Sequence, residues 1–403
     1  MVYDRKNCSG GVVRMKTLIE LFDERPIENV LASEVFAPET TVFLCPEEIA
    51  SNREYQRNLN GFFKRRGLKL RTVFLKTELY YADRVAEQIV NVTNKYSDCV
   101  LEITGGSDAA LFGAGMICEE TGLPVFTYSI RRNRFYSILG ADFVNDVPCR
   151  IEHSVEDCFL MAGGSLRQGR VDNSVLGRYL SYFDGFMEIY LDHKREWSSA
   201  VNYVQRASQT EKGAPVSLHV RTDYTLKGDR GRRLDCPEEL LRELEKLGFL
   251  QKLRITRQEV SFDFLDAQVR IWLRDTGSVL ELYTYKCCLD AGIFHDVVTS
   301  AVVDWEKNGG RDTVTNEIDV MATVGIHPLF ISCKTCDITT EALNELAILR
   351  DRFGGSVAKA AIVTTQGCRS ITRHRAAELA IFVIDADDIK AGRVTELLRG
   401  LMD

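Results

Sequence analysis

Short runs of apolar and β-branched residues alternate with longer amphipathic stretches from residue 16 to about residue 140. Five runs are typical of buried strands: TLIELF, TTVFLC, LRTVFLKT, CVLEIT and PVFTYSI. Segments with helical spacing, such as YADRVAEQIVNVTNKY, separate them. Strands separated by helices of this length need right-handed crossovers, which form a parallel sheet covered on both faces. The pattern predicts a Rossmann-like α/β domain over residues 15–145.

The pattern is less regular over residues 146–250, which we interpret as a connector. LGRYLSYFDGFMEIYLDHKREWSSAVNYVQRAS has aromatic and aliphatic residues at helical spacing, which predicts helices. A polar, glycine-bearing stretch then ends at Pro237, which two glutamates follow, as at a helix start. This helix and the strand-like runs after it resemble a small winged-helix unit.

The last part of the chain, residues 251–403, has a different order of elements. From Gly277 the pattern predicts a helix (SVLELYTYKCCLDAG), three strands (VTSAVVDWEK, NEIDVMATV, PLFISCKT), a helix (TEALNELAILRDRFG) and a strand (KAAIVTT). The order αβββαβ, with a glutamate on the first helix and an aspartate and a lysine on the strands, is that of a restriction-endonuclease-like core.

Composition narrows the class of protein. The 403 residues suffice for two or three domains, and 45% of them are hydrophobic and 27% charged, as in globular proteins. No apolar run reaches the roughly 18 residues that span a bilayer, and MVYDRKNCSGGVVRMK lacks a signal core. The 12 scattered cysteines suit buried thiols in a reducing compartment. We therefore expect a cytoplasmic protein without membrane contact.

The net charge of −7 provides no overall attraction to nucleic acid, so local basic groups must hold any polyanion. In the first domain, ITGGSDAALFGAGMI places a glycine-rich turn between the fourth strand and a helix, where free N–H groups favour phosphate. A second loop, LFDERPIEN, follows the first strand, and both loops lie at the carboxyl edge of the sheet. The candidate ligand residues are Thr104, Gly105, Gly106 and Ser107 in the turn, Asp23, Glu24, Arg25 and Asn29 in the loop, and Arg131 after the fifth strand.

In the last domain, Asp319 and Lys334 are predicted near the ends of two neighbouring strands. A carboxylate and a lysine placed in this way are typical of metal-dependent phosphodiesterases. Such a site normally has a second acid two residues before the lysine, where this chain has Ser332.

TLIELFDERPIENVL followed by EITGGSDAALFGAG resembles a CARF domain, the Rossmann-like sensor of cyclic oligoadenylate in type III CRISPR defence. VLELYTY, NEID and FISCKT resemble the PD-(D/E)XK half of CRISPR ancillary nucleases with the same two-part build. The resemblance covers most of the chain, and it is carried by the pairing and order of the motifs. It implies a homodimer with one cyclic tetra-adenylate pocket, and a metal-dependent nuclease that cleaves DNA, RNA or both.

The chemistry of the second site suggests a role for each residue. Asp319 is the candidate ligand of Mg²⁺ or Mn²⁺, and Glu281 is a further ligand or orients a metal-bound water. Lys334 holds the attacking water or stabilises charge on the phosphate. Two replacements for the missing acid are open: the carbonyl of Cys333, and a carboxylate from the next helix, Glu345 or Glu341.

Two other functions remain open from the sequence. Because Ser332 departs from the family pattern, the chain is alternatively a catalytically inactive nucleotide sensor, or a nucleic-acid-binding scaffold with a degenerate nuclease domain. A weaker alternative is an enzyme of nucleotide metabolism that uses the Rossmann-like domain.

Overall fold

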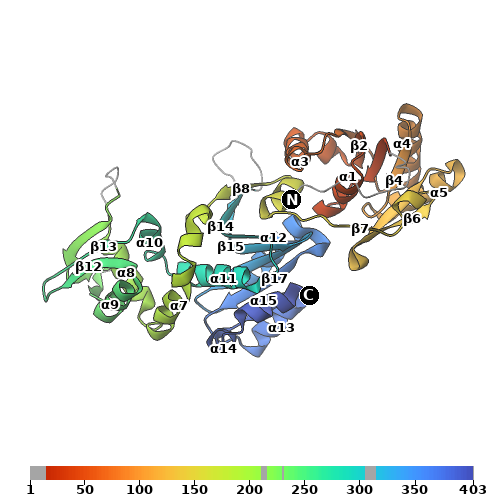
Figure 1. Ribbon diagram of the computed structural model, residues 1–403. Coiled ribbons are helices and arrows are strands. Elements are labelled where there is room, and N and C mark those ends of the chain that lie inside the picture. The colour runs from red at the N-terminus through yellow and green to blue at the C-terminus, as the bar shows by residue number, and fades with distance from the viewer. Residues whose placement is uncertain (1–14, 210–215, 229–230, 305–314, 403) are drawn as a thin grey trace.

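The computed structural model of the protein describes residues 15–209, 216–228, 231–304 and 315–402. Figure 1 shows an N-terminal α/β domain, a central α/β domain built mostly from the end of the chain, and a smaller lobe between them in sequence that lies at the opposite end of the molecule. No helix of these residues is long and apolar enough to cross a membrane.

A seven-stranded sheet in the order β3-β2-β1-β4-β5-β6-β7 forms the N-terminal domain. The five predicted strands are confirmed as β1 to β5, and they pair in parallel. The pattern did not predict the last two strands, β6 and the edge strand β7, which are added antiparallel beyond β5. The bounds are β1 (Thr17–Leu21), β2 (Thr40–Cys45), β3 (Arg71–Lys76), β4 (Cys99–Glu102), β5 (Val125–Ser129), β6 (Arg134–Leu139) and β7 (Val147–Pro148).

Helices cover both faces of this sheet because its strands are apolar on both sides. Ile19 of β1 packs in the cluster that holds α4 and α5, whereas Leu18 packs in the cluster that holds α3 and α6. The helical bounds are η1 (Pro26–Asn29), α1 (Leu31–Phe36), α2 (Glu47–Ala50), α3 (Arg53–Arg65), α4 (Ala82–Lys95), α5 (Asp108–Thr121) and α6 (Val155–Met161).

The central domain has a six-stranded sheet in the order β18-β17-β16-β15-β14-β8. The predicted αβββαβ order is confirmed as α11, β14, β15, β16, α12 and β17. The bounds are β8 (Ser165–Gln168), α11 (Ser278–Ala291), β14 (Asp296–Asp304), β15 (Thr315–Val324), β16 (His327–Lys334), α12 (Thr340–Gly354), β17 (Lys359–Thr364), α13 (Ser370–Glu378), β18 (Ile381–Ile384), α14 (Ala386–Lys390) and α15 (Val394–Met402).

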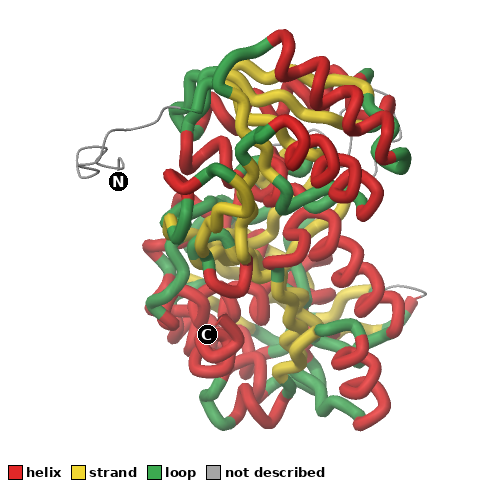
Figure 2. The backbone as a smooth tube through the Cα atoms, turned by 90° about the vertical axis from the view of Figure 1, so that its right-hand side faces the viewer, coloured by secondary structure: helices red, strands yellow, loops and turns green. Residues whose placement is uncertain are grey.

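One apolar cluster joins the two domains. It contains Leu18 and Phe62 of the N-terminal domain together with Phe330 and Phe353 of the central domain. Phe159 of α6 lies between the two, with its ring 5.0 Å from that of Phe353. Figure 2 shows the strands running through the interior with helices outside them. The face of the first sheet that carries α3 and α6 is therefore joined by shared core to the α12 face of the second.

The expected connector contains more strand than the sequence pattern predicted. Its first part supplies β8 to the central sheet, and the rest forms the lobe with a three-stranded sheet in the order β12-β13-β9. The expected boundary at residues 250 and 251 falls at the start of β12, which pairs within the lobe. The bounds are α7 (Phe183–Asp192), α8 (Trp197–Ala207), β9 (His219–Asp223), β10 (Thr225–Lys227), β11 (Arg233–Asp235), α9 (Glu238–Leu247), β12 (Leu250–Ile255), β13 (Glu259–Phe264) and α10 (Ala267–Trp272).

Candidate active site and candidate ligand site

Three of the predicted catalytic residues come together on the central sheet. Glu281 lies in the first turn of α11 and is only 7% exposed, because α11 packs against β14, β15 and β16. Lys334 is the last residue of β16, and its Nζ lies 3.7 Å from Oδ2 of Asp319. The position predicted for Asp319 is wrong in one respect: it lies in the middle of β15, which extends to Val324, and not near the end of the strand.

Asp319 is held by the neighbouring strand. Its Oδ2 accepts hydrogen bonds from the backbone N–H of Cys333 at 2.6 Å and from the hydroxyl of Ser332 at 3.1 Å. The serine at the position of the missing acid therefore orients the aspartate. A hydroxyl that donates to a carboxylate cannot replace a second anionic ligand.

The backbone opposite Asp319 is irregular. Ser300 of β14 has φ of +51°, a left-handed conformation that is uncommon for a residue with a side chain. Its hydroxyl donates to Glu317 Oε1 at 2.7 Å, while the Thr299 hydroxyl donates to the Asp319 carbonyl at 2.7 Å. Irregular strand geometry of this kind re-aims side chains next to active sites.

Both carboxyl groups of the site resist ionisation. Burial, and then the charges of Asp319 and Asp275, raise the pKa of Glu281 to about 8. Burial also raises the pKa of Asp319, although Lys334 and the Cys333 N–H act in the opposite direction. Buried acids whose pKa is raised by burial and by neighbouring charges are a frequent sign of a functional site. Here they would be stabilised in their ionised form by a cation.

Three further charged residues next to this site, Arg170, Asp275 and Glu317, were not predicted from the sequence. Arg170, in the segment that follows β8, pairs with Asp275 at 3.0 Å and with Glu317 at 3.4 Å. Glu317 could have been found from the sequence, because it precedes Asp319 by two positions in the same predicted strand. Asp275 and Arg170 could not, because only the tertiary fold brings them to this sheet.

The expected metal set, which joins the carboxylates of Asp319 and Glu345 to the carbonyl of Cys333, stays a prediction. Among the described residues, no three His, Cys, Asp or Glu are grouped as they would be around an ion. Glu345 is exposed on α12 and accepts a hydrogen bond from the Asn316 amide at 2.5 Å.

The two predicted loops of the N-terminal domain do meet. The backbone N–H of Gly106 donates to Asp23 Oδ2 at 3.1 Å, and Asn29 holds the Asp23 backbone through its side-chain amide. Ser107 caps α5 by accepting from the N–H of Ala110. Burial opposes ionisation of Asp23, but the bonds from Arg25 and Gly106 outweigh it and lower its pKa. Of the remaining predicted ligand residues, Glu24 and Arg131 have exposed side chains.

Three buried carboxyl groups beneath these loops were also missed. Glu20 and Glu102 are register partners on β1 and β4, and Glu28 follows in η1. Thr104 donates its backbone N–H to Glu102 at 2.9 Å, which ties this acid to the glycine-rich turn. Burial raises the pKa of all three groups, that of Glu102 to about 7. For Glu20 and Glu102, the available signal was a charged residue within the apolar runs TLIELF and CVLEIT.

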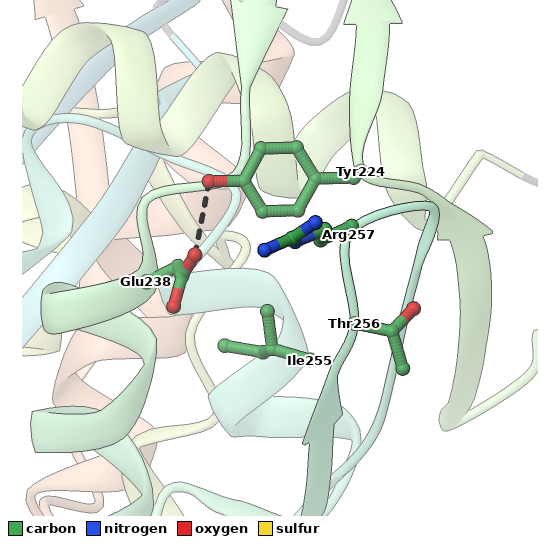
Figure 3. Close-up of a pocket in the computed structure, with 5 residues that line it drawn as sticks. All are labelled: Tyr224, Glu238, Ile255, Thr256 and Arg257. Atoms are coloured by element: carbon green, nitrogen blue, oxygen red, sulfur yellow. Dashed lines mark hydrogen bonds between the residues drawn. The ribbon is translucent and has the colours of Figure 1, made fainter.

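A separate hollow of about 480 Å³ lies in the lobe, lined by Tyr224, Glu238, Ile255, Thr256 and Arg257 (Figure 3). The Tyr224 hydroxyl donates to Glu238 at 3.0 Å. None of the residues predicted from the sequence lines this hollow.

Comparison with known proteins shows that this fold has been seen before. Residues 268–401 match the family described as "Card1-like, endonuclease domain". Protein VC1899 from Vibrio cholerae has a similar fold, with a TM-score of 0.71 and 17% identity over 96% of this chain and 97% of that one. Can2 from Sulfobacillus thermosulfidooxidans, solved in complex with cyclic tetra-adenylate, has a TM-score of 0.69 and 14% identity over 96% and 99%. No curated protein sequence matches the chain. The expected two-part fold is confirmed, and its C-terminal part matches an endonuclease domain.

Proposed function

We propose that this chain, whose C-terminal part is of the Card1-like endonuclease type, is a nuclease of type III CRISPR defence that is activated by a cyclic oligoadenylate, cyclic tetra-adenylate being the first candidate. The observation that carries the proposal is that buried Glu281 lies beside Asp319 and the partly exposed Lys334, all within the residues that match the endonuclease family. The glycine-rich turn of a fold similar to that of Can2 supports the activator.

A divalent cation fits the acids of this site. Glu281 and Asp319 are buried, and their pKa values are raised. The nearby Arg170 forms ion pairs with Asp275 and Glu317 rather than with these two acids. Mg²⁺ and Mn²⁺ take oxygen ligands, and Mg²⁺ is commonly held by one or two carboxylates with water and substrate phosphate. Asp319 and Glu281 are the residues that would hold the ion. When bound, it would lower the pKa of a water and neutralise charge on the phosphate.

The protein side chains supply the remaining functions. Lys334 keeps a third of its side chain exposed beside Asp319, so its ammonium can donate to a phosphate oxygen and stabilise the charge that develops during hydrolysis. Ser332 and the Cys333 N–H fix the Asp319 carboxylate, which limits reorganisation when substrate binds.

The test is a cleavage assay with Mn²⁺ or Mg²⁺, cyclic oligoadenylates of several ring sizes, and labelled single- and double-stranded DNA and RNA. Cleavage that requires both an activator and a metal ion supports the proposal. Ligand binding without cleavage of any of these substrates would favour the inactive-sensor alternative, to which Ser332 points.

We also propose a homodimer formed through α5, and expect Phe112→Asp to make it monomeric. Phe112 and Met116, one turn apart on α5, are 67% and 58% exposed, and the exposed Tyr80 and Tyr81 directly precede α4, which packs against α5. A patch of this kind on one domain marks a protein contact. Since α5 begins at the glycine-rich turn, a two-fold axis there places two turns around one symmetric ligand.

Light scattering measures the mass of each variant. Ile371→Asp, at an apolar residue of the central domain that is 76% exposed, is the matched control and should remain a dimer. A dimeric Phe112→Asp protein would remove α5 from the interface, and a monomeric wild type would refute the dimer.

We expect Gly106→Ala to abolish the rise in melting temperature that cyclic tetra-adenylate causes. Gly106 has φ of +98°, and a Cβ there would lie 2.9 Å from the Leu21 Cβ. The turn must therefore move, and the backbone N–H of residue 106 no longer points toward the ligand. Gly67→Ala is the control: Gly67 has φ of +72°, but its Cβ would meet nothing within 4 Å. Gly67→Ala should lose roughly 1 kcal/mol of stability because of its positive φ, and Gly106→Ala should lose more because of the added contact with Leu21. An undiminished ligand shift in Gly106→Ala would place the ligand elsewhere.

A further inference from the structure

The loop after β1, residues 22–29, contacts both the glycine-rich turn and the central domain. At one end, Asp23 accepts the Gly106 N–H at 3.1 Å. At the other, Glu28 accepts the hydroxyl of Ser356, in the segment after α12, at 2.8 Å. Arg25 joins the ends, with two bonds of 2.8 and 2.9 Å to the Asp23 carboxylate and an ion pair of 3.4 Å to Glu28. One short loop thus spans the distance from the turn to the second domain.

Asp23 occupies the place that an anionic ligand would take. A helix N-terminus and a glycine-rich turn attract an anion, and here the Gly106 N–H is already bonded to a carboxylate. A ligand phosphate that approached this N–H would be repelled by the Asp23 charge and would compete for the same donor. The Asp23 carboxylate is also held by the Arg25 guanidinium, whose charge a phosphate could attract equally well.

The end of the loop that carries Glu28 is tightly packed against the central domain. A displacement of Glu28 would therefore move the residues of that domain that contact it. Glu28 is 4% exposed. Gly355, which precedes Ser356, has φ of +59°, and a Cβ on it would lie 3.2 Å from the Arg25 Cβ. Gly355 directly follows α12, and α12 bonds β15 through Glu345 and Asn316. That strand carries Asp319.

We infer that the Asp23 carboxylate is a built-in competitor for the anion position at Gly106, and that its displacement by the ligand is transmitted through Arg25 and Glu28 to Ser356 of the central domain. The inference rests on the proposed function, because it concerns how the same ligand regulates the same nuclease. Coupling between two sites requires an element that contacts both, and here that element is the loop of residues 22–29.

Two variants separate the two ends of the loop. Asp23→Asn removes the competing charge with little change of shape, so cyclic tetra-adenylate should bind about tenfold more tightly by calorimetry. Cleavage without ligand should also rise. Ser356→Ala removes one hydroxyl at an exposed position, so ligand affinity should stay unchanged while the ratio of cleavage with ligand to cleavage without it falls severalfold.

Matched controls are Asp83→Asn, on α4 with its side chain 79% exposed, and Ser51→Ala, which also removes one exposed hydroxyl bond. Both should behave as the wild type. Weaker ligand binding by Asp23→Asn would make Asp23 a ligand contact and overturn the competitor role. Full activation of Ser356→Ala would overturn the transmission step. A wild type that no cyclic oligoadenylate activates would refute the proposed function itself, which distinguishes that failure from the failure of this inference.

Discussion

We expect Asp319→Ala to lower the rate of cleavage about a thousandfold or more while the protein stays folded. Asp319 lies at the centre of the site. Its Oδ2 accepts hydrogen bonds from Ser332 and Cys333 and pairs with Lys334. Removing it also removes the charge that helps to raise the pKa of Glu281. The measurements are cleavage of a labelled strand with activator, Mn²⁺ affinity by calorimetry, and thermal unfolding.

Three variants accompany this experiment. Asp337→Ala, an exposed acid beyond the end of β16, is the control and should cleave at the wild-type rate. Lys334→Ala should reduce turnover and spare Mn²⁺ binding, because an ammonium is not a metal ligand. Glu345→Ala tests the displaced acid: a loss equal to that of Asp319→Ala would assign Glu345 to the metal site, whereas wild-type cleavage leaves Asp319 and Glu281 as its carboxylates. Retention of metal and activity by Asp319→Ala would refute the proposed site.

With Mn²⁺ kept below saturation, the rate of cleavage by the wild type should rise about tenfold per pH unit from pH 6 toward pH 8, and then level off. With a pKa of about 8 in the metal-free protein, Glu281 is mostly protonated at neutral pH, and only its ionised form can ligate a cation. Binding of Mn²⁺ at pH 7 should therefore release close to one proton. Calorimetry in buffers of different ionisation enthalpy measures that proton directly.

Stability should depend on pH in the opposite direction. The pKa of Glu281 is higher in the folded protein than its ordinary value near 4.5, so the folded state binds the proton more tightly. Its contribution is fully present below about pH 4.5 and is lost as the pH rises to about 8, by up to about 1.4 kcal/mol per unit. Glu281→Gln should unfold with a flatter pH profile and be more stable than the wild type at pH 8. Equal pH profiles for the two proteins would show that Glu281 does not titrate in this range.

The elements that the sequence predicted well are those whose signal is local. The strands β1 to β5 are short apolar runs, and α11 and α12 have helical spacing, so each can be recognised without knowledge of its partners. β8 could not be predicted, because SLRQ is polar and its partner β14 is far along the chain. The lobe strands β12 and β13 have alternating exposure, and they were correctly seen only as strand-like runs near a helix.

The candidate sites follow the same division. Asp319, Lys334 and Glu281 could be found because the order of elements fixes where their strands and helix lie. The role of Ser332 as a donor to Asp319 could be recognised only from the structure. The same holds for the contact of Glu28 with Ser356, because these two residues are far apart in sequence. The mid-strand position of Asp319 escaped prediction because strand length depends on pairing with β14 and not on the residues of β15 alone.

The pairing of β8 with β14 has a consequence for any attempt to study the nuclease by itself. A fragment that began at residue 251 would lack β8, which covers β14 through the pairs from Ala301 with Gln168 to Asp304 with Ser165. The uncovered edge of β14 would offer unpaired N–H and C=O groups to other molecules, a known route to aggregation. It would also lose Arg170, and with it the counter-charge of Asp275 and Glu317. The two halves of the protein are therefore not modules that can be recombined at a linker, since the chain that leaves the N-terminal domain completes the sheet of the central domain.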